Sequence, residues 1–99
     1  MFHHLLSLQA GAYQNAAWVL ASAKCGAEDG FGMIAGSAIV APTGEIAAQA
    51  LSEEDEVITA TLDLDLGQYL RRTVFNFEKH RRTEHYRLIT ERTGARTEV

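Results

Sequence analysis

The side chains of this 99-residue chain that are suited to chemistry are one cysteine and four histidines. Cys25 is the single thiol, so any role as a thiol nucleophile would fall to it. Glu28 and Asp29 follow it closely, and negative charge nearby raises the pKa of a thiol. The alternative role, a small buried hydrophobic residue, is the usual one for an isolated cysteine. The sequence favours that second role.

The four histidines form two pairs with poor spacing for a shared metal ion. His3 and His4 are adjacent, and on a helix their side chains diverge by about 100°. His80 and His85 lie five residues apart, without carboxylates at ligand spacing. The sequence therefore predicts no metal site. It also lacks the glycine patterns of dinucleotide and P-loop sites, so we expect no cofactor.

Charge divides the chain into an acidic body and a basic tail. Residues 1–70 carry one base and nine acids, a net charge of −8, whereas residues 71–99 carry eight bases and four acids, a net charge of +4. A basic tail can bind nucleic acid, but acids recur through this one and few aromatic residues are available to stack on bases. We expect it to dock on an acidic protein surface of its own or a neighbouring subunit, and we expect no nucleic-acid partner.

Length and composition set further limits. Ninety-nine residues suit one domain with a thin core. The apolar runs are far shorter than the roughly 20 residues of a membrane-spanning helix, and the N-terminus lacks a signal-peptide pattern. A single cysteine forms no internal disulfide, which fits a reducing compartment. We expect a cytoplasmic location and no membrane partner.

The first part of the chain has helical and then strand-like patterning. Apolar residues at helical spacing predict a helix over residues 2–15, and they predict a buried face made of Phe2, Leu5, Leu6 and Tyr13. A short apolar run predicts a strand over about 17–24 that is buried on both faces. Residues 26–32 read as a glycine-rich loop of the kind that borders sites.

The remainder predicts three strands, a helix and a tail. The turn sequence Ala41-Pro42-Thr43-Gly44 predicts a hairpin between strands at 33–41 and 45–51. Alternating β-branched residues predict a strand at 56–63. Asp65 and Gln68 form a pair like a capping box, at the start of a helix predicted over 65–77. We expect an extended tail after it and a disordered end at 90–99. The fold class is α/β, with the character of an α+β fragment.

Five stretches of the sequence become informative when they are taken together. They are HHLLSLQAGAYQNAAW at 3–18, GAEDG at 26–30, GSAIVAPTGEI at 36–46, EDEVITA at 54–60 and FNFEKHR at 75–81. They strongly resemble the C-terminal third of N-carbamoyl-D-amino-acid hydrolases, which are carbon–nitrogen hydrolases of the nitrilase superfamily. The resemblance runs from about Phe2 to Ile89, so residues 1–89 are expected to form the C-terminal part of such a domain. The hairpin stretch is shared across the superfamily, whereas the first and last are more particular to the carbamoylases.

This resemblance implies a four-layer α-β-β-α sandwich in which two protomers pair to extend the stack. It also implies a mechanism in which a cysteine thiolate attacks the carbamoyl carbon, a glutamate acts as general base and a lysine stabilises the tetrahedral oxyanion. The products are a D-amino acid, ammonia and carbon dioxide. No metal is required.

The resemblance places all three catalytic residues upstream of the position that matches Phe2, so it predicts no catalytic residue within this sequence. Cys25 matches an aliphatic position of the relatives, and Glu28 matches a loop acid rather than the general base. His3 matches a histidine near the substrate pocket and is the one predicted substrate-binding residue. The alternative for His3 is a surface position on the first turn of a helix. Thr83 replaces a proline that is usual in the tail.

We therefore expect the C-terminal segment of an N-carbamoyl-D-amino-acid amidohydrolase that is inactive alone. It would meet its small-molecule substrate, a carbamoyl amino acid, only with the rest of the enzyme present. The alternative is a non-catalytic interaction protein that uses the same sheet and tail. In both cases the expected partner is a second copy, giving a homo-oligomer, or a full-length relative.

Overall fold

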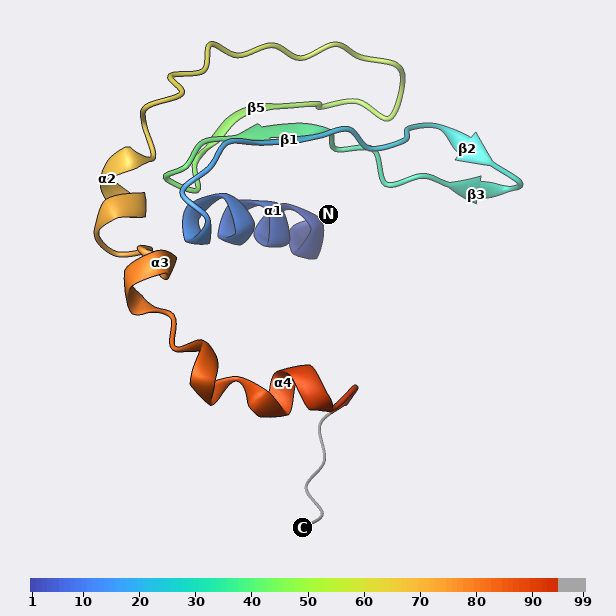
Figure 1. Ribbon diagram of the computed structural model, residues 1–99. Helices are drawn as coiled ribbons and strands as arrows, with labels where there is room; N and C mark the ends of the chain where they lie inside the picture. The colour runs from blue at the N-terminus through green and yellow to red at the C-terminus, as the bar shows by residue number, and fades with distance from the viewer. Residues whose placement is uncertain (95–99) are drawn as a thin grey trace.

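One helix packed on a small antiparallel sheet forms the body of the molecule (Figure 1). The computed structural model describes residues 1–94. The helix is α1 (Phe2–Gln14), close to the predicted 2–15, and the strands are β1 (Val19–Ala21), β4 (Ala38–Val40) and β5 (Ile46–Gln49), in the order β1-β4-β5. This mixture of helices and antiparallel strands is an α+β arrangement, as expected.

The core lies between α1 and the face of the sheet that it covers. Its residues are Ala12, Ala38 and Val40, fully buried, with Leu5, Leu8 and Val19 packed around them. The helical members are three and four residues apart, so they form one stripe along α1. Small side chains at Ala12 and Ala38 let the helix approach the strands closely.

The predicted buried face of α1 is mostly wrong. Of its four residues only Leu5 packs against the core, while Phe2, Leu6 and Tyr13 are between 41% and 70% exposed. The sheet lies against the stripe that contains Ala12, whose small side chain permits close packing, rather than against the bulkiest residues.

The hairpin turn is confirmed between β4 and β5. The Gly44 N–H donates to the Ala41 carbonyl at 2.8 Å, and Gly44 has a φ of +85°, which glycine adopts without strain. Pro42 is completely buried. The strands are shorter than the predicted 33–41 and 45–51, and their pairing contains a register shift between Ile39 and Val40.

The segment predicted as a glycine-rich loop contains a short ribbon. It consists of β2 (Ala27–Glu28) and β3 (Phe31–Gly32), paired antiparallel with Ala27 opposite Gly32. All four residues are exposed, and Figure 1 shows the ribbon projecting beyond the end of the main sheet.

Strand β1 differs from the strand predicted over 17–24. It is three residues long and open on one face, where Leu20 is 63% exposed. Helix α1 covers the other face. Within residues 1–94 no second layer of sheet covers Leu20, so burial on both faces is not observed.

No strand forms at 56–63. The segment crosses above the open face of the sheet in Figure 1, and none of the backbone hydrogen bonds of the described residues joins 56–62 to a strand. Its alternation is nevertheless visible, because Ile58, Ala60 and Leu62 are half-buried while the residues between them are exposed. The side-chain period is that of a strand, but the described chain provides no ladder partner.

The helix predicted over 65–77 is replaced by two short ones, α2 (Gln68–Arg72) and α3 (Phe77–His80). The predicted pair does meet, since Gln68 Nε2 donates to Asp65 Oδ1 at 2.9 Å, but it lies in a turn that precedes α2. Thr73 follows the last residue of α2, and its hydroxyl donates a hydrogen bond to the Tyr69 carbonyl at 2.6 Å. Asn76 then caps α3 through the Lys79 N–H at 3.1 Å.

The joint between the body and α2 is tight. The Arg71 guanidinium donates to the Ala16 carbonyl at 3.1 Å, and Trp18 Nε1 donates to the Asp63 carbonyl at 2.8 Å. A Cβ on Gly67 would lie 2.2 Å from the Ala16 carbonyl oxygen. Only glycine permits this approach.

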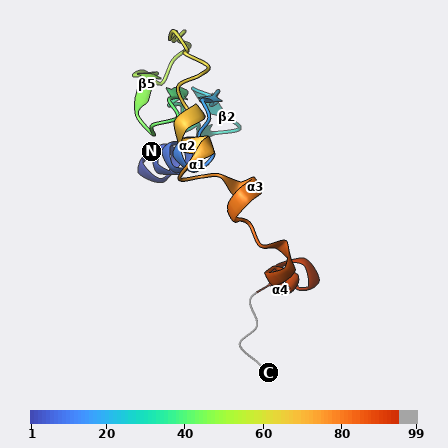
Figure 2. The ribbon, with the colours of Figure 1, turned by 60° about the vertical axis from the view of Figure 1, so that its left-hand side comes forward.

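Residues 77–94, which we call the arm, leave the body as a chain of short helical turns (Figure 2). After α3 come the 3₁₀ turn η1 (Thr83–His85) and α4 (Arg87–Glu91), so the predicted extended tail is wrong. Local contacts stabilise α4, including an Arg87–Glu91 ion pair at 2.7 Å. Of the end predicted as disordered, residues 90 and 91 belong to α4, and residues 95–99 lie outside the described residues.

The molecule is open in shape. Its radius of gyration is 17.8 Å, against about 13 Å for a compact domain of this length. Its accessible surface is 7962 Å², against roughly 5,600 Å² for a compact monomer of this mass. No helix within residues 1–94 combines the length and apolar character needed to cross a bilayer.

Candidate functional site

The first turn of α1 carries the predicted substrate-binding residue. His3 is exposed, and its ring meets the Phe2 ring edge-on at 5.2 Å between centroids. No hydrogen bond or ion pair joins the His3 side chain to another described residue. Its predicted role therefore stays a prediction.

The neighbouring histidine is the one that contacts the loops. His4 is half-buried, and its Nε2 donates to the Gly36 carbonyl at 3.0 Å. Gly36 has a φ of +75°, and a Cβ there would lie 2.5 Å from the Met1 side chain. The start of α1 is thus fixed against the chain that enters β4. The sequence does not mark His4 for this contact, although the offset of about 100° between adjacent helical side chains allows only one of the two histidines to face inward.

Ser37 joins three segments beside this contact. Its Oγ accepts from the Ala23 N–H at 2.8 Å and donates to the Ala23 carbonyl at 3.4 Å. Its own carbonyl accepts from the Ala50 N–H at 2.8 Å. One serine therefore connects the chain that leaves β1 to the ends of the β4–β5 hairpin.

Cys25 lies near this junction and faces a carboxylate. Its thiol donates to Asp55 Oδ1 at 3.2 Å. This hydrogen bond, together with some burial and the charge of Asp55, raises the pKa of the Cys25 thiol above its ordinary value. A thiol held in its protonated form is a weak nucleophile at neutral pH. The absence of a catalytic role for Cys25 stays a prediction.

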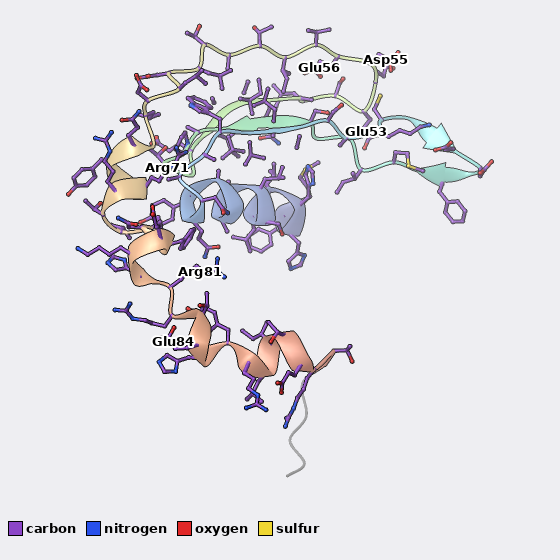
Figure 3. The ribbon with its side chains drawn as sticks, in the orientation of Figure 1. Glu53, Asp55, Glu56, Arg71, Arg81 and Glu84 are labelled. Atoms are coloured by element: carbon purple, nitrogen blue, oxygen red, sulfur yellow. The ribbon has the colours of Figure 1, made fainter. Side chains whose placement is uncertain are left out.

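Glu56 organises the turn that carries Asp55 (Figure 3). Its carboxylate accepts from the Leu51 and Ser52 N–H groups at 3.0–3.1 Å and from the Ser52 hydroxyl at 2.9 Å. These hydrogen bonds hold the pKa of Glu56 below its ordinary value. The Glu56 carboxylate therefore has a structural role, because its oxygens accept hydrogen bonds from the backbone and from the Ser52 hydroxyl.

The chemistry available at this junction is limited. A small cavity of about 40 Å³ is lined by Cys25, by Ser37 and by the acidic turn. The adjacent lysine, Lys24, forms an ion pair with Glu28 at 3.0 Å.

Metal chemistry has no support within the described part of the chain. No group of three or more histidine, cysteine, aspartate or glutamate side chains is close enough there to hold an ion. His80 and His85 lie exposed on the arm.

An open cleft of about 310 Å³ lies between the face of the sheet opposite α1 and the segment that crosses it. Its walls include Leu20 and Ile39 from the sheet and Val57 and Ile58 from the crossing segment. The predicted site residues do not line it. Neither this cleft nor the Cys25–Asp55 contact has a local sequence signal, because each joins residues far apart along the chain.

Comparisons with known proteins agree with this architecture. The carbon-nitrogen hydrolase family matches residues 1–72 of the chain. A solved structure, the carbon-nitrogen hydrolase from Helicobacter pylori G27, is similar in fold, with a TM-score of 0.78 and 24% sequence identity. The match covers 92% of this chain but 33% of that one, so the chain spans a third of the length of that structure. Because the family match extends over most of its residues, this chain belongs to the carbon-nitrogen hydrolase family.

Proposed function

We propose that this chain forms the C-terminal part of an N-carbamoyl-D-amino-acid amidohydrolase and is inactive without the preceding part of the fold. The observation that carries the proposal is the match to one third of a carbon-nitrogen hydrolase structure, by a chain whose sheet is covered by a helix on one face only. The surface in excess of a compact monomer, about 2,400 Å², is of the size that a permanent protein contact buries.

The chemistry of the described residues supports a fold in which the preceding part supplies the catalytic groups and this chain supplies the scaffold. Hydrolysis of a carbamoyl group requires a thiolate that attacks the carbonyl carbon, a base that receives the thiol proton and a cation that stabilises the oxyanion. Cys25 is held as a thiol by Asp55, and Lys24 is paired with Glu28. These residues build the scaffold, and the catalytic groups would come from the preceding part.

The experiment compares the chain alone with the chain joined to a catalytic segment. Purified alone, it should release no ammonia from N-carbamoyl-D-amino acids. Produced together with the first two thirds of a carbamoylase, it should restore ammonia release, and Cys25→Ser in this chain should leave the restored rate unchanged. An N-carbamoyl-L-amino acid, a simple amide and a nitrile serve as substrate controls. Turnover by the chain alone that is lost in Cys25→Ser would refute the proposal.

A second candidate role is that of a non-catalytic interaction protein that pairs with itself or with a full-length relative. The exposed apolar residues favour it, because Leu20, Val57 and Ile89 have no cover in the described chain and are more than 60% exposed. Light scattering on the purified chain tests it. A folded monomer at all concentrations that also fails to bind a full-length carbamoylase would exclude it.

A further inference from the structure

A hollow of about 440 Å³ lies where the end of α1 meets α2 and the start of α3 (Figure 1). This volume is within the range of small-molecule pockets, about 300–1,000 Å³. The walls of the hollow include Asn15, Arg71, Arg72, Phe75, Phe77 and Glu78. Two cationic groups, one carboxylate and two aromatic rings therefore border one space.

Both arginines of the hollow are fixed in place and keep donors free. Arg71 Nη2 donates to the Ala16 carbonyl at 3.1 Å, and Arg72 Nη2 donates to Gln68 Oε1 at 2.9 Å. Within residues 1–94 the other guanidinium nitrogens of both arginines have no acceptor, and neither arginine forms an ion pair. Two fixed guanidinium groups with free donors suit a carboxylate.

Acceptors for a cation border the same hollow. The Glu78 carboxylate has no hydrogen bond or ion pair with another of residues 1–94. Asn15 Nδ2 donates to the Gly11 carbonyl at 2.8 Å, which fixes the amide, and its Oδ1 has no donor among the described residues. A carboxylate and an amide oxygen together can accept the hydrogen bonds of an ammonium group.

Two phenylalanine rings form the apolar wall of the hollow. The Phe75 ring meets the Tyr13 ring edge-on at 4.9 Å between centroids, and the Phe77 ring lies 6.3 Å from the Phe75 ring. Phe77 is 47% exposed, so part of its ring is open to a ligand. An aromatic ligand would pack there in the offset or edge-on arrangement that such rings prefer.

We propose that this hollow binds the zwitterion of a free α-amino acid with an aromatic side chain. The two arginines hold the carboxylate, Glu78 and Asn15 accept from the ammonium group, and the side chain packs on Phe77. A doubly charged anion such as a phosphate ester would meet the Glu78 carboxylate, which opposes it. The proposal goes beyond the amidohydrolase activity and does not depend on it, because only the side chains around the hollow carry the argument.

The test adds phenylalanine, as each enantiomer, to the full chain and follows the amide NMR signals of residues 75–78. At least one enantiomer should give saturable shifts with a Kd of about 1–10 mM. Three analogues each lack one group, since 3-phenylpropionate has no ammonium, 2-phenylethylamine has no carboxylate and alanine has no ring. Each should bind at least about fivefold more weakly than phenylalanine.

Two variants assign the charged groups. Glu78→Gln should weaken phenylalanine binding at least about fivefold without weakening 3-phenylpropionate, which has no ammonium group. Arg72→Gln should weaken both of these ligands by a similar factor without weakening 2-phenylethylamine. The matched controls Glu84→Gln and Arg82→Gln make the same changes at exposed positions outside the hollow, and they should leave each Kd within about twofold. Circular dichroism verifies that each variant retains its fold.

Three results with the unmodified chain would overturn the proposal. One is the absence of saturable shifts with both enantiomers, and another is equal binding of phenylalanine and all three analogues. The third is tighter binding of phenyl phosphate than of phenylalanine, which would assign the arginines to a phosphorylated ligand. A control variant that weakens phenylalanine as much as its matched partner would also contradict the assignment. The ammonia assay does not detect this binding, so failure of the amidohydrolase proposal is a separate result.

Discussion

The body around α1 and the arm beyond it differ in composition and in surroundings, because 40 of residues 1–76 but only 4 of residues 77–94 are apolar. In the body, Ala12, Ala38 and Val40 are fully buried between a helix and a sheet. In the arm, Leu88 and Ile89 are mostly exposed, and the hydrogen bonds of residues 81–92 join partners within the arm. An apolar residue stabilises a fold only when another element covers it.

The body and the arm are stabilised by different kinds of contact. The body depends on contacts between distant segments, such as His4 with Gly36 and Arg71 with Ala16. The arm depends on contacts three or four residues apart, such as Arg87 with Glu91. Isolated helices of four or five residues are marginal in water, so the arm requires a partner to be rigid, whereas the body contains its own core.

The joint between the two regions gives the largest expected effect. Gly67→Ala would push a methyl group against the Ala16 carbonyl, with 2.2 Å between Cβ and oxygen, and should cost about 3 kcal/mol of unfolding free energy. Urea denaturation followed by Trp18 fluorescence measures it, because Trp18 bonds the Asp63 carbonyl in the same region. Gly94→Ala, where a Cβ would meet nothing within 4 Å, is the control. Equal stability of the two variants would show that the joint is loose.

A smaller effect is expected from the core. Val40→Ala removes two buried methyl groups and should lower the unfolding free energy by about 2 kcal/mol. Leu20→Ala, on the open face of the same sheet, should change it by less than about 0.5 kcal/mol. If both variants lost the same stability, the open face would be covered in solution.

Immediately before the arm, Asn76→Ala removes the cap that accepts from the Lys79 N–H. It should cost about 1 kcal/mol in the stability of α3 while the unfolding of the body is unaltered. Hydrogen exchange of the amides of residues 77–81 against those of β4 measures the two regions separately. Asn76→Asp retains the capping oxygen and should behave like the original chain. Loss of protection in β4 would contradict the independence of the arm.

The smallest effect concerns the turn that Glu56 holds at Leu51 and Ser52, and its dependence on pH. Folding lowers the pKa of Glu56, so its contribution is present above the unfolded pKa and is lost as pH falls through the lower folded pKa. Acidification should therefore release the turn at Leu51 and Ser52 before the core unfolds, seen as shifts of their amide NMR signals. Glu56→Gln should remove this pH dependence. Amide signals in that variant that titrate as before would assign the transition to another group.

Local patterns predicted the elements whose causes are local. The helix at residues 2–15 and the turn at Pro42 and Gly44 follow from apolar spacing and from backbone preferences, and both are observed. The helix predicted over 65–77 is interrupted at Thr73. There the Thr73 hydroxyl bonds the Tyr69 carbonyl, and Asn76 caps a separate helix after it. The strand over 56–63 has the right side-chain period, but its ladder needs a neighbour that the described chain does not supply.

The candidate site was less accessible to prediction. His3 and His4 differ by one position, and only the packing of α1 on the sheet decides that His4 meets Gly36. The Cys25–Asp55 contact joins residues thirty positions apart, and no local pattern marks it. The low nucleophilicity expected for Cys25 was attributed to Glu28 and Asp29, whereas Asp55 is the residue in contact with the thiol.

The sequence by itself determined the family, the first helix, the hairpin turn and the division of charge, because each depends on residue types and short spacings. The tertiary structure decided which stripe of α1 is buried, which face of the sheet is open and which charged and aromatic groups border the hollow beside α2. Those properties depend on contacts between segments far apart in the chain. Packing of α1 against β4 buries Val40 and leaves Leu20 to solvent, although both are apolar residues on paired strands.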